Sequence, residues 1–300
     1  YMLVLVRTIV IMGCLLVIIA VLQKAAWNGR IYWFYPIDPA MESRISGIWG
    51  PYINRNHFAG YLEMAVPLAL GLLMYALSRD RRERGQTALK RIFSLAGRRN
   101  LPTFALLVLA VVVMSGALFA TLSRGGILGF AASMAAFILM MRSRRSLRSN
   151  MDVFLVVGII VAAVGLFAAW DRIEGRFTDL TNENRIMRTQ VWSDLTGLVR
   201  DFPLLGTGSG TFDRVFPRYQ SKYSTILFEH AENDYLEVLV ETGLIGLSLA
   251  IATAAVFFGT MIGLWRDRRS SLSTCLGAGG LASCTAIAVH SLTDFNLKIP

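Results

Sequence analysis

The chain is poor in the residues on which disulfide-bonded and metal-binding proteins depend. It has three cysteines and three histidines among 300 residues. Cys14, Cys275 and Cys284 all stand inside apolar runs, and neither they nor the histidines show the spacing of a metal site or of a disulfide framework. We therefore expect three buried free thiols, no metal and no other cofactor.

Charged residues are also scarce, at 17% of the chain, whereas 54% of the residues are hydrophobic and the mean hydropathy is +0.52. This composition excludes a disordered chain and is too apolar for an ordinary soluble domain. The net charge of +10 comes with arginine clusters between apolar runs, a pattern typical of membrane topology rather than of nucleic-acid binding. We therefore expect contact with membrane lipids and no nucleic-acid partner.

Apolar runs about as long as a membrane is thick recur along the chain. The sequence predicts about seven spans, at residues 3–22, 58–77, 101–121, 127–141, 153–170, 238–264 and 272–290. The expected fold is all-α: a polytopic membrane helix bundle, one integral membrane domain over residues 1–300, with a large helical loop at 171–237 between spans five and six. Because the chain begins at Tyr1 and stops just after the last span, we expect a fragment of a longer protein.

Basic residues are concentrated in three short connections, at 78–100, 142–150 and 266–269. With seven spans all three connections lie on one side of the membrane, and the positive-inside rule makes that side cytoplasmic. The opposite side then receives the turn near 122–126 and the loop 171–237. An error of one span in the middle of the chain would separate the arginine clusters, so their agreement supports the predicted topology.

The loop 171–237 has the composition of a folded segment rather than of a linker, because it is nearly neutral and contains several aromatic residues. Residues 182–200 are predicted to form an amphipathic helix, since Arg188, Trp192, Leu195 and Val199 fall on one face. Asp201-Phe202-Pro203 is expected to end this helix. The glycines at 206, 208 and 210 that follow predict a turn, because no βαβ unit and no P-loop lysine accompany them.

Arg124 is the first candidate for chemistry. It stands in Ser123-Arg124-Gly125-Gly126, between spans three and four. The two glycines are expected to leave backbone N–H groups open at a helix start, where anions are favoured. A phosphate site and an arginine that only reaches for the membrane interface both fit this pattern.

Arg185 and Arg188 are the second candidates. They lie three residues apart on the predicted loop helix and therefore project to neighbouring positions. The planar guanidinium group is well shaped for phosphate, so a second phosphate clamp is one reading. A solvated helix face is the other.

His230, Glu232 and Asn233 form the third group, where the loop re-enters the membrane. Polar groups near hydrocarbon are costly unless they are paired or in use. His230 and Glu232 can each act as a general base. The alternative is that Glu232 and Asn233 cap the following helix.

Two further groups are expected to be structural. Glu63 lies inside span two and needs a partner, for which Arg55 and His57 are the candidates. His290 and Asp294 stand four residues apart where span seven leaves the membrane, and we expect them to pair.

Taken in order, these motifs resemble those of the O-antigen ligase family of bacterial inner-membrane proteins. The most specific is the last, an Asn followed after nine residues by Gly-x-x-Gly. The motifs that carry the resemblance are Asn54–Tyr61, Ser123–Gly126, Arg188-x-x-x-Trp192, Pro203–Gly208, and Asn233 with Gly243–Gly246.

The resemblance implies glycosyl transfer at the periplasmic face of the inner membrane, without a metal. The donor would be a glycan on undecaprenyl diphosphate. The acceptor would be lipid A–core in lipopolysaccharide assembly, a growing glycan in related polymerases, or a protein in related oligosaccharyltransferases. Family ligases usually have His directly before the Asn, whereas this chain has Glu232 there and His230 two positions earlier, so the identity of the base stays open.

The expected mechanism is an inverting transfer. Arg124, Arg188 and Arg185 would stabilise the departing diphosphate, and Glu232 or His230 would take the proton of the acceptor hydroxyl, with Asn233, His57 and Arg55 in support. A transporter of lipid-linked polysaccharide is the rival from another class. The absence of a visible internal repeat and the collection of polar residues at one boundary favour the enzyme.

Overall fold

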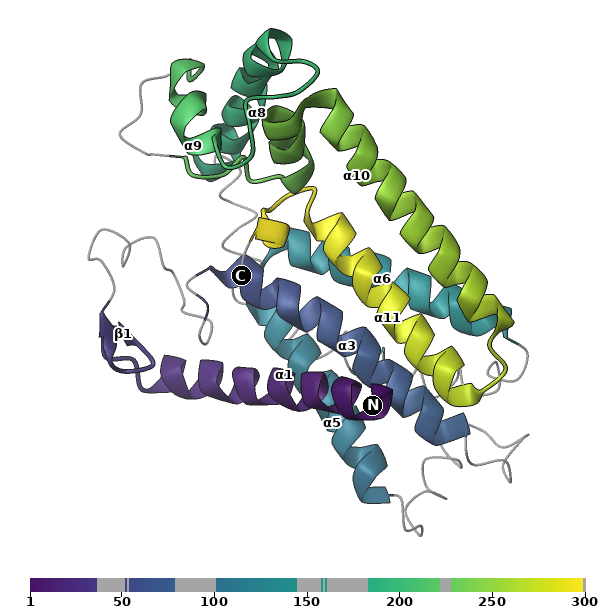
Figure 1. Cartoon of the computed structure of the whole chain (residues 1–300). Helices are drawn as coiled ribbons and strands as arrows, with labels where there is room; N and C mark the ends of the chain where they lie inside the picture. Colours follow the sequence, from purple (N-terminus) through teal and green to yellow (C-terminus); the bar gives the residue numbers. More distant parts are fainter. Residues whose placement is uncertain are drawn as a thin grey trace. The chain divides into compact units, whose positions relative to one another are not determined.

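The computed structural model of the chain describes residues 1–36, 52, 54–78, 101–144, 158, 160, 183–221 and 228–298, and for residues 183–188 only the backbone. Nearly all regular structure in this part is helical (Figure 1). The exception is a short antiparallel hairpin of β1 (Arg30–Ile31) and β2 (Tyr35–Pro36). The all-α class predicted from the sequence is confirmed.

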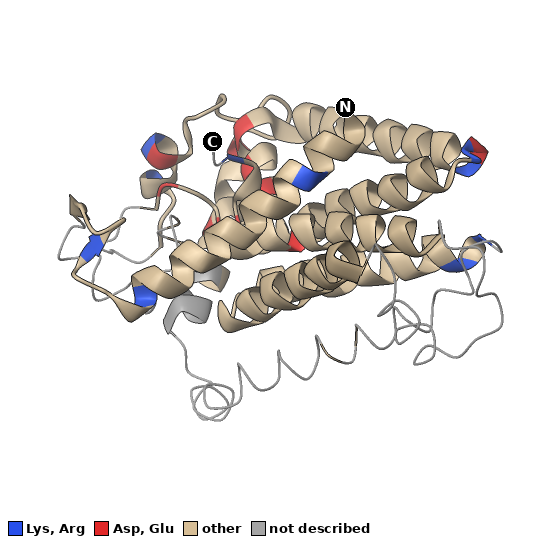
Figure 2. Cartoon of the chain, turned by 90° about the horizontal axis from the view of Figure 1, so that it is seen from below, with Lys and Arg blue, Asp and Glu red and all other residues tan. Residues whose placement is uncertain are grey.

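Six helices of the described part are long and apolar enough to cross a membrane. Figure 2 shows these helices almost free of charge along their length, with Lys, Arg, Asp and Glu gathered mainly at their ends. Six of the seven predicted spans are thereby confirmed, and the chain is a multi-pass membrane protein. The helices are α1 (Met2–Ala25), α3 (Arg55–Ser78), α5 (Leu101–Ala120), α6 (Arg124–Ser143), α10 (Asp234–Asp267) and α11 (Ser271–His290).

The predicted span 153–170 lies outside the described residues, apart from residues 158 and 160, which are helical. The chain forms two compact units, one of residues 1–170 with 264–287 and one of residues 171–263 with 288–300. The second unit begins at the same residue as the predicted loop 171–237. The prediction of one integral membrane domain over residues 1–300 stays a prediction.

In the first unit, α3 packs closely along α11 in the opposite direction. Ser283 donates a hydrogen bond to the carbonyl oxygen of Met64 at 2.6 Å. A Cβ atom at Gly71 would stand 2.7 Å from the carbonyl oxygen of Cys275, and one at Gly279 would stand 2.7 Å from that of Pro67. Small residues therefore let the two backbones approach, as is usual for helices packed in a membrane.

Arg144, directly after α6, meets the last turn of α10 within the same unit. The guanidinium group of Arg144 donates to the carbonyl oxygens of Trp265 and Arg266 at 2.6 and 2.7 Å. It also lies 4.6 Å from the centre of the Trp265 ring, a cation–π distance. The described starts of two of the three arginine-rich connections therefore lie together, in agreement with the predicted topology.

In the second unit, α8 (Glu183–Asp201) ends where Asp201-Phe202-Pro203 predicts. Two short helices follow, α9 (Phe212–Val215) and η3 (Phe216–Arg218), and η4 (Asn296–Lys298) comes after α11. The expectation that the loop folds is confirmed for its described part. The core of this second unit consists of Val191, Leu195, Leu198, Phe212, Phe216, Ala231 and Val240.

The buried face of α8 is turned slightly from the predicted one. Val191, Leu195 and Leu198 are fully buried, whereas Trp192 and Val199 are only partly buried against the core. The indole N–H of Trp192 donates to the carbonyl oxygen of Ala231 at 2.9 Å. This bond fixes the residue directly after His230, which belongs to the candidate site.

Candidate functional site

A break in α10 shapes the site. Gly243 has φ 67° and ψ −170° inside the helix, a conformation that essentially only glycine adopts. The backbone groups that the break leaves without helical partners bond to residues 203–208 instead. These hydrogen bonds of 2.9–3.2 Å join Thr207 N to Val240 O, Gly208 N to Glu241 O, Leu244 N to Pro203 O, and Ile245 N to Leu204 O.

Two glycines make this docking possible. A Cβ atom at Gly243 would collide with the carbonyl group of Leu204, and one at Gly206 would collide with the backbone of Glu241. The glycine turn predicted at 206–210 is confirmed, since Gly206, Gly208 and Gly210 all have positive φ. The docked segment thus fixes the direction of the first ten residues of α10, which carry the acidic side chains described next.

Asn233 caps the start of α10. Its Oδ1 accepts hydrogen bonds from the N–H groups of Tyr235 and Leu236 at 3.0 and 3.1 Å. Its Nδ2 donates to the carbonyl oxygen of Leu292 at 2.8 Å. The interpretation of Asn233 as a helix cap is therefore confirmed, and the same side chain ties the helix start to the segment after α11.

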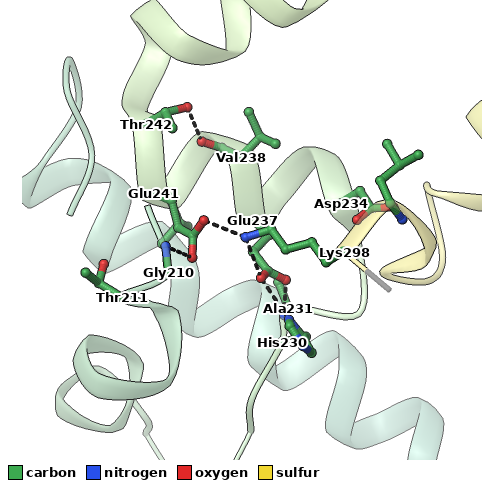
Figure 3. Close-up of polar contacts among 12 residues, drawn as sticks. Gly210, Thr211, His230, Ala231, Asp234, Glu237, Val238, Glu241, Thr242 and Lys298 are labelled. Carbon is green, nitrogen blue, oxygen red and sulfur yellow. Dashed lines mark hydrogen bonds and ion pairs between the residues drawn. The ribbon is translucent and has the colours of Figure 1, made fainter. Parts of the chain in front are cut away.

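Two carboxylates of α10, one turn apart, lie buried beside this cap. Glu237 is 1% exposed and Glu241 is 3% exposed. Oε2 of Glu237 accepts the N–H of Ala231 and Oε1 of Glu241 accepts the N–H of Gly210, each at 3.0 Å. Buried carboxylates are costly unless they are paired, and Figure 3 shows where their partners lie.

Lys298 is the cationic partner of both carboxylates. Its Nζ lies 2.5 Å from Oε2 of Glu241 and 3.0 Å from Oε1 of Glu237 (Figure 3). Burial alone would lower the pKa of this ammonium group. The hydrogen bonds to Glu241 and Glu237 and the charges of the two carboxylates outweigh burial and raise the pKa above its ordinary value. Lys298 is therefore protonated throughout the physiological range.

His230 is the third partner of this cluster. Its Nδ1 lies 2.9 Å from Oε1 of Glu237, and its ring stacks on Phe295 with centroids 4.3 Å apart. Because an ionised carboxylate only accepts hydrogen bonds, Nδ1 carries the hydrogen and Nε2 is the basic nitrogen of the neutral ring. Nε2 makes no hydrogen bond to any described residue, and the side chain is 29% exposed. The ring is thus held at one edge and accessible at the other.

Glu232 lies two residues from His230 in a different setting. It is half-buried, and its φ of 55° places a non-glycine residue in the left-handed region. Such backbone strain persists only where the surroundings impose it. The cap of Asn233 on one side and the buried N–H of Ala231 on the other are those constraints. Glu232 therefore stands at a position of the turn whose backbone conformation is imposed by its surroundings.

Arg124 lies at the start of α6 and is exposed. The side chain of Ser123 caps this helix and accepts the N–H of Gly126 at 3.1 Å. The expectation that both glycines leave open N–H groups is therefore wrong for Gly126. A Cβ atom at Gly126 would also stand 2.6 Å from Cβ of Ala59, so this glycine serves close packing of α6 on α3.

The remaining predicted residues fall into three cases. Arg185 and Arg188 lie on α8, but their side chains are outside the described part of the chain. His57 lies in the first turn of α3 with Nε2 3.1 Å from Nδ2 of Asn54, and Arg55 begins that helix. The pairing of Glu63 with Arg55 or His57 stays a prediction.

The expected pairing of His290 with Asp294 is confirmed. Nε2 of His290 lies 3.7 Å from Oδ2 of Asp294, and both side chains are at most 1% exposed. The backbone N–H of Asp234 donates to the carbonyl oxygens of Ser291 and Asp294. This pair therefore helps to hold the segment after α11 against the start of α10.

Sequence reasoning missed Glu237, Glu241 and Lys298 as site residues. The two glutamates carried a usable signal, because acids four residues apart at the entrance of an apolar run need a partner. Lys298 carried none, since it is separated by 57 positions from Glu241. Only the fold brings η4 to the start of α10.

Comparison with known proteins gives one family match. The family model described as O-antigen ligase matches residues 109–251, which include Arg124, the docked segment 203–208 and the cluster from His230 to Glu241. A search of curated proteins finds no match to the chain. The family match supports a glycosyltransferase-like enzyme of the ligase or polymerase type, acting on glycan and lipid-linked substrates. The resemblance seen in the motifs is thereby supported, since residues 109–251 of this membrane protein match the model of the O-antigen ligase family.

Proposed function

We propose that this protein transfers a glycan from undecaprenyl diphosphate to an acceptor hydroxyl at the periplasmic face of the bacterial inner membrane. The acceptor that we favour is lipid A–core, which makes the reaction O-antigen ligation. The observation that carries the proposal is the His230–Glu237 pair at the start of a membrane helix. An imidazole oriented by a buried carboxylate, with its second nitrogen accessible, is the usual arrangement of a general base.

His230 is the better candidate for the base than Glu232. Its ring is fixed by the bond to Glu237 and by stacking on Phe295, and a fixed ring loses little freedom when the acceptor binds. In the proposed step, Nε2 takes the hydroxyl proton while the hydroxyl oxygen attacks the anomeric carbon. The bond from that carbon to the diphosphate oxygen breaks, and its electron pair leaves with the lipid. Direct attack inverts the anomeric centre.

The departing diphosphate carries negative charge that needs cationic partners. We assign this role to Arg124, with Arg188 and Arg185 as further contributors, so that no metal is required. The exposed guanidinium of Arg124 at a capped helix start supports the assignment. The predicted topology puts the start of α6 and the loop 171–237 on the same side of the membrane, as a shared substrate requires.

The test is a transfer assay with purified protein in lipid nanodiscs and no ion gradient. An undecaprenyl-diphosphate-linked glycan is offered with lipid A–core, free glycan and peptide acceptors together. We expect glycosylated lipid A–core and free undecaprenyl diphosphate. Arg200→Ala, which removes an exposed arginine of α8, is the matched control and should leave the yield unchanged.

The other products would each redirect the proposal. Extended glycan would identify a polymerase, and glycosylated peptide would identify a protein oligosaccharyltransferase of the same family. The absence of any transfer, combined with movement of the lipid-linked glycan across the bilayer of proteoliposomes, would identify the transporter and overturn the proposal.

A further inference from the structure

The cluster at the start of α10 has an unequal number of positive and negative groups. Glu237 and Glu241 each contribute a carboxylate, whereas Lys298 contributes one ammonium group bound to both. While His230 is neutral, the four side chains therefore carry one negative charge in excess. A proton gained at Nε2 of His230 would bring the cluster to neutrality, and neutral clusters cost least when they are buried.

Resting on the proposed function, we infer that Glu237, Glu241 and Lys298 form a charge cradle whose role is to set how readily Nε2 of His230 accepts a proton. Glu237 is the positioning residue for the ring, Lys298 limits how strongly the cradle attracts the proton, and Glu241 holds Lys298 in place. Lys298 lies outside residues 109–251, which match the family model. The cradle therefore makes η4, after the last described span, a part of the candidate site.

The position of Lys298 explains how it acts on His230. Both its Nζ and the Nδ1 of His230 lie within 3.0 Å of the same oxygen, Oε1 of Glu237. Two positive charges that share one carboxylate oxygen are close enough to repel strongly at a partly buried site. Lys298 consequently opposes protonation of His230 and offsets part of the attraction that Glu237 and Glu241 exert on the proton.

Glu241 is built to hold this lysine. Its Oε1 is occupied by the N–H of Gly210 and its Oε2 is bound by Lys298. The N–H of Gly208 donates to the carbonyl oxygen of the same residue, so the docked glycine turn fixes both ends of Glu241. The Glu241 carboxylate is therefore held in place, and it fixes the position of the Lys298 ammonium group.

The other charged groups near the cradle add no positive charge. Asp234 is 3% exposed, and its Oδ2 accepts the N–H of Leu297 at 3.1 Å. Glu232 is half-buried in the preceding turn and Glu229 is exposed to solvent. On the segment after α11, Asp294 is buried and lies beside His290. Lys298 is thus the cation of this cradle among the described residues, which makes it the group to remove.

The decisive measurement is the titration of His230 in the whole protein without substrate. Labelled histidine gives three signals, for His57, His230 and His290. The signal that is missing in His230→Gln belongs to His230. Lys298→Met should move the titration midpoint of His230 upward by about one pH unit, because the opposing charge is lost. Lys298→Arg keeps the charge and should restore the wild-type midpoint.

Glu241→Gln removes a negative charge instead of a positive one, and the glutamine side chain keeps an oxygen that can accept the N–H of Gly210. It leaves Lys298 bound to Glu237 alone, so the His230 midpoint should move downward by about half a unit. Glu229→Gln removes an equal charge from an exposed neighbour and should leave the midpoint in place. If Lys298→Met does not fold, the direction of the Glu241→Gln shift decides alone.

A midpoint that stays fixed in the folded variants, or that moves in the same direction in both, overturns the cradle. The acid limb of the pH–rate profile for glycosyl transfer should follow each shift. Predicted midpoint shifts without any transfer activity would leave the cradle standing and overturn the proposed function. Transfer that needs His230, with no midpoint shifts, would overturn the cradle and leave the function standing.

Discussion

The starts of α6 and α10 have the same capping chemistry and opposite surroundings. Ser123 caps α6 through the N–H of Gly126, and Asn233 caps α10 through the N–H groups of Tyr235 and Leu236. After the cap, α6 continues with two buried glycines and an exposed arginine. In contrast, the first two turns of α10 hold buried carboxylates.

This difference shows how one structural feature can serve two chemical tasks. A helix start attracts negative charge, and the first turn of α6 contains no acidic residue, so the proposed anionic substrate group would suit the exposed Arg124 there. At α10 the chain supplies the acids itself, and these hold His230 and Lys298 instead. The first start is therefore suited to a diphosphate and the second to a proton.

Removal of the cation at the α6 start should have the largest effect. Arg124→Ala should reduce transfer by about 10³-fold, because a departing diphosphate then lacks its charge partner. Arg124→Lys should recover part of the rate, since a point charge remains without the planar fork. Initial rates in nanodiscs at saturating donor measure both. Near-normal transfer by Arg124→Ala would remove α6 from the reaction.

Neutralising the orienting carboxylate at the α10 start should have the next largest effect. Glu237→Gln keeps the shape of the side chain but loses the charge that orients and stabilises His230, so kcat should fall by about 10²-fold. The substrate KM should change little, because Glu237 is buried and contacts His230 rather than solvent. A large rise in KM with unchanged kcat would show instead that Glu237 shapes substrate binding.

The kink below the α10 start should control stability rather than chemistry. Gly243→Ala should lower the free energy of unfolding by about 2 kcal/mol, because alanine is strained at φ 67° and meets the carbonyl group of Leu204. Gly259→Ala, on the same helix with open space around it, is the matched control and should stabilise slightly. Thermal unfolding in detergent measures both, and equal effects would contradict the docking of residues 203–208.

The two caps should show the smallest effects. Ser123→Ala and Asn233→Ala should each cost about 1 kcal/mol of stability. The Asn233 variant should cost somewhat more, because it also loses the hydrogen bond to Leu292 O. Ser123→Asp and Asn233→Asp should each keep the part of the stability that comes from the capping hydrogen bond. An equal loss in the two alanine variants would mean that the bond to the segment after α11 contributes nothing.

Much of the fold could be predicted because the bilayer imposes simple rules. Runs of apolar residues located α1, α3, α5, α6, α10 and α11. The arginine clusters predicted that the connections after α6 and α10 lie on one side of the membrane, and the bonds of Arg144 to Trp265 and Arg266 agree with this. The end of α8 was predicted because Pro203 stands two residues after it. These signals are local, and each can be recognised within about 20 residues of sequence.

The rest could not be predicted because it depends on contacts between distant residues. Glu241-Thr242-Gly243 interrupts the apolar run after Val238, but the role of Gly243 appears only when residues 203–208 dock on the helix. Similarly, the sequence left open whether Glu232 or His230 is the base. The buried Glu237 and the ring of Phe295 distinguish them, and Phe295 lies far along the chain.

The most direct test of the central claim compares His230→Ala with Glu232→Gln in the same transfer assay. His230 is the proposed base, so His230→Ala should lose about 10²-fold or more in rate while the protein still folds and inserts. Glu232→Gln should keep most of the wild-type rate. Loss of transfer in Glu232→Gln, with activity retained in His230→Ala, would contradict the assignment and move the base to Glu232.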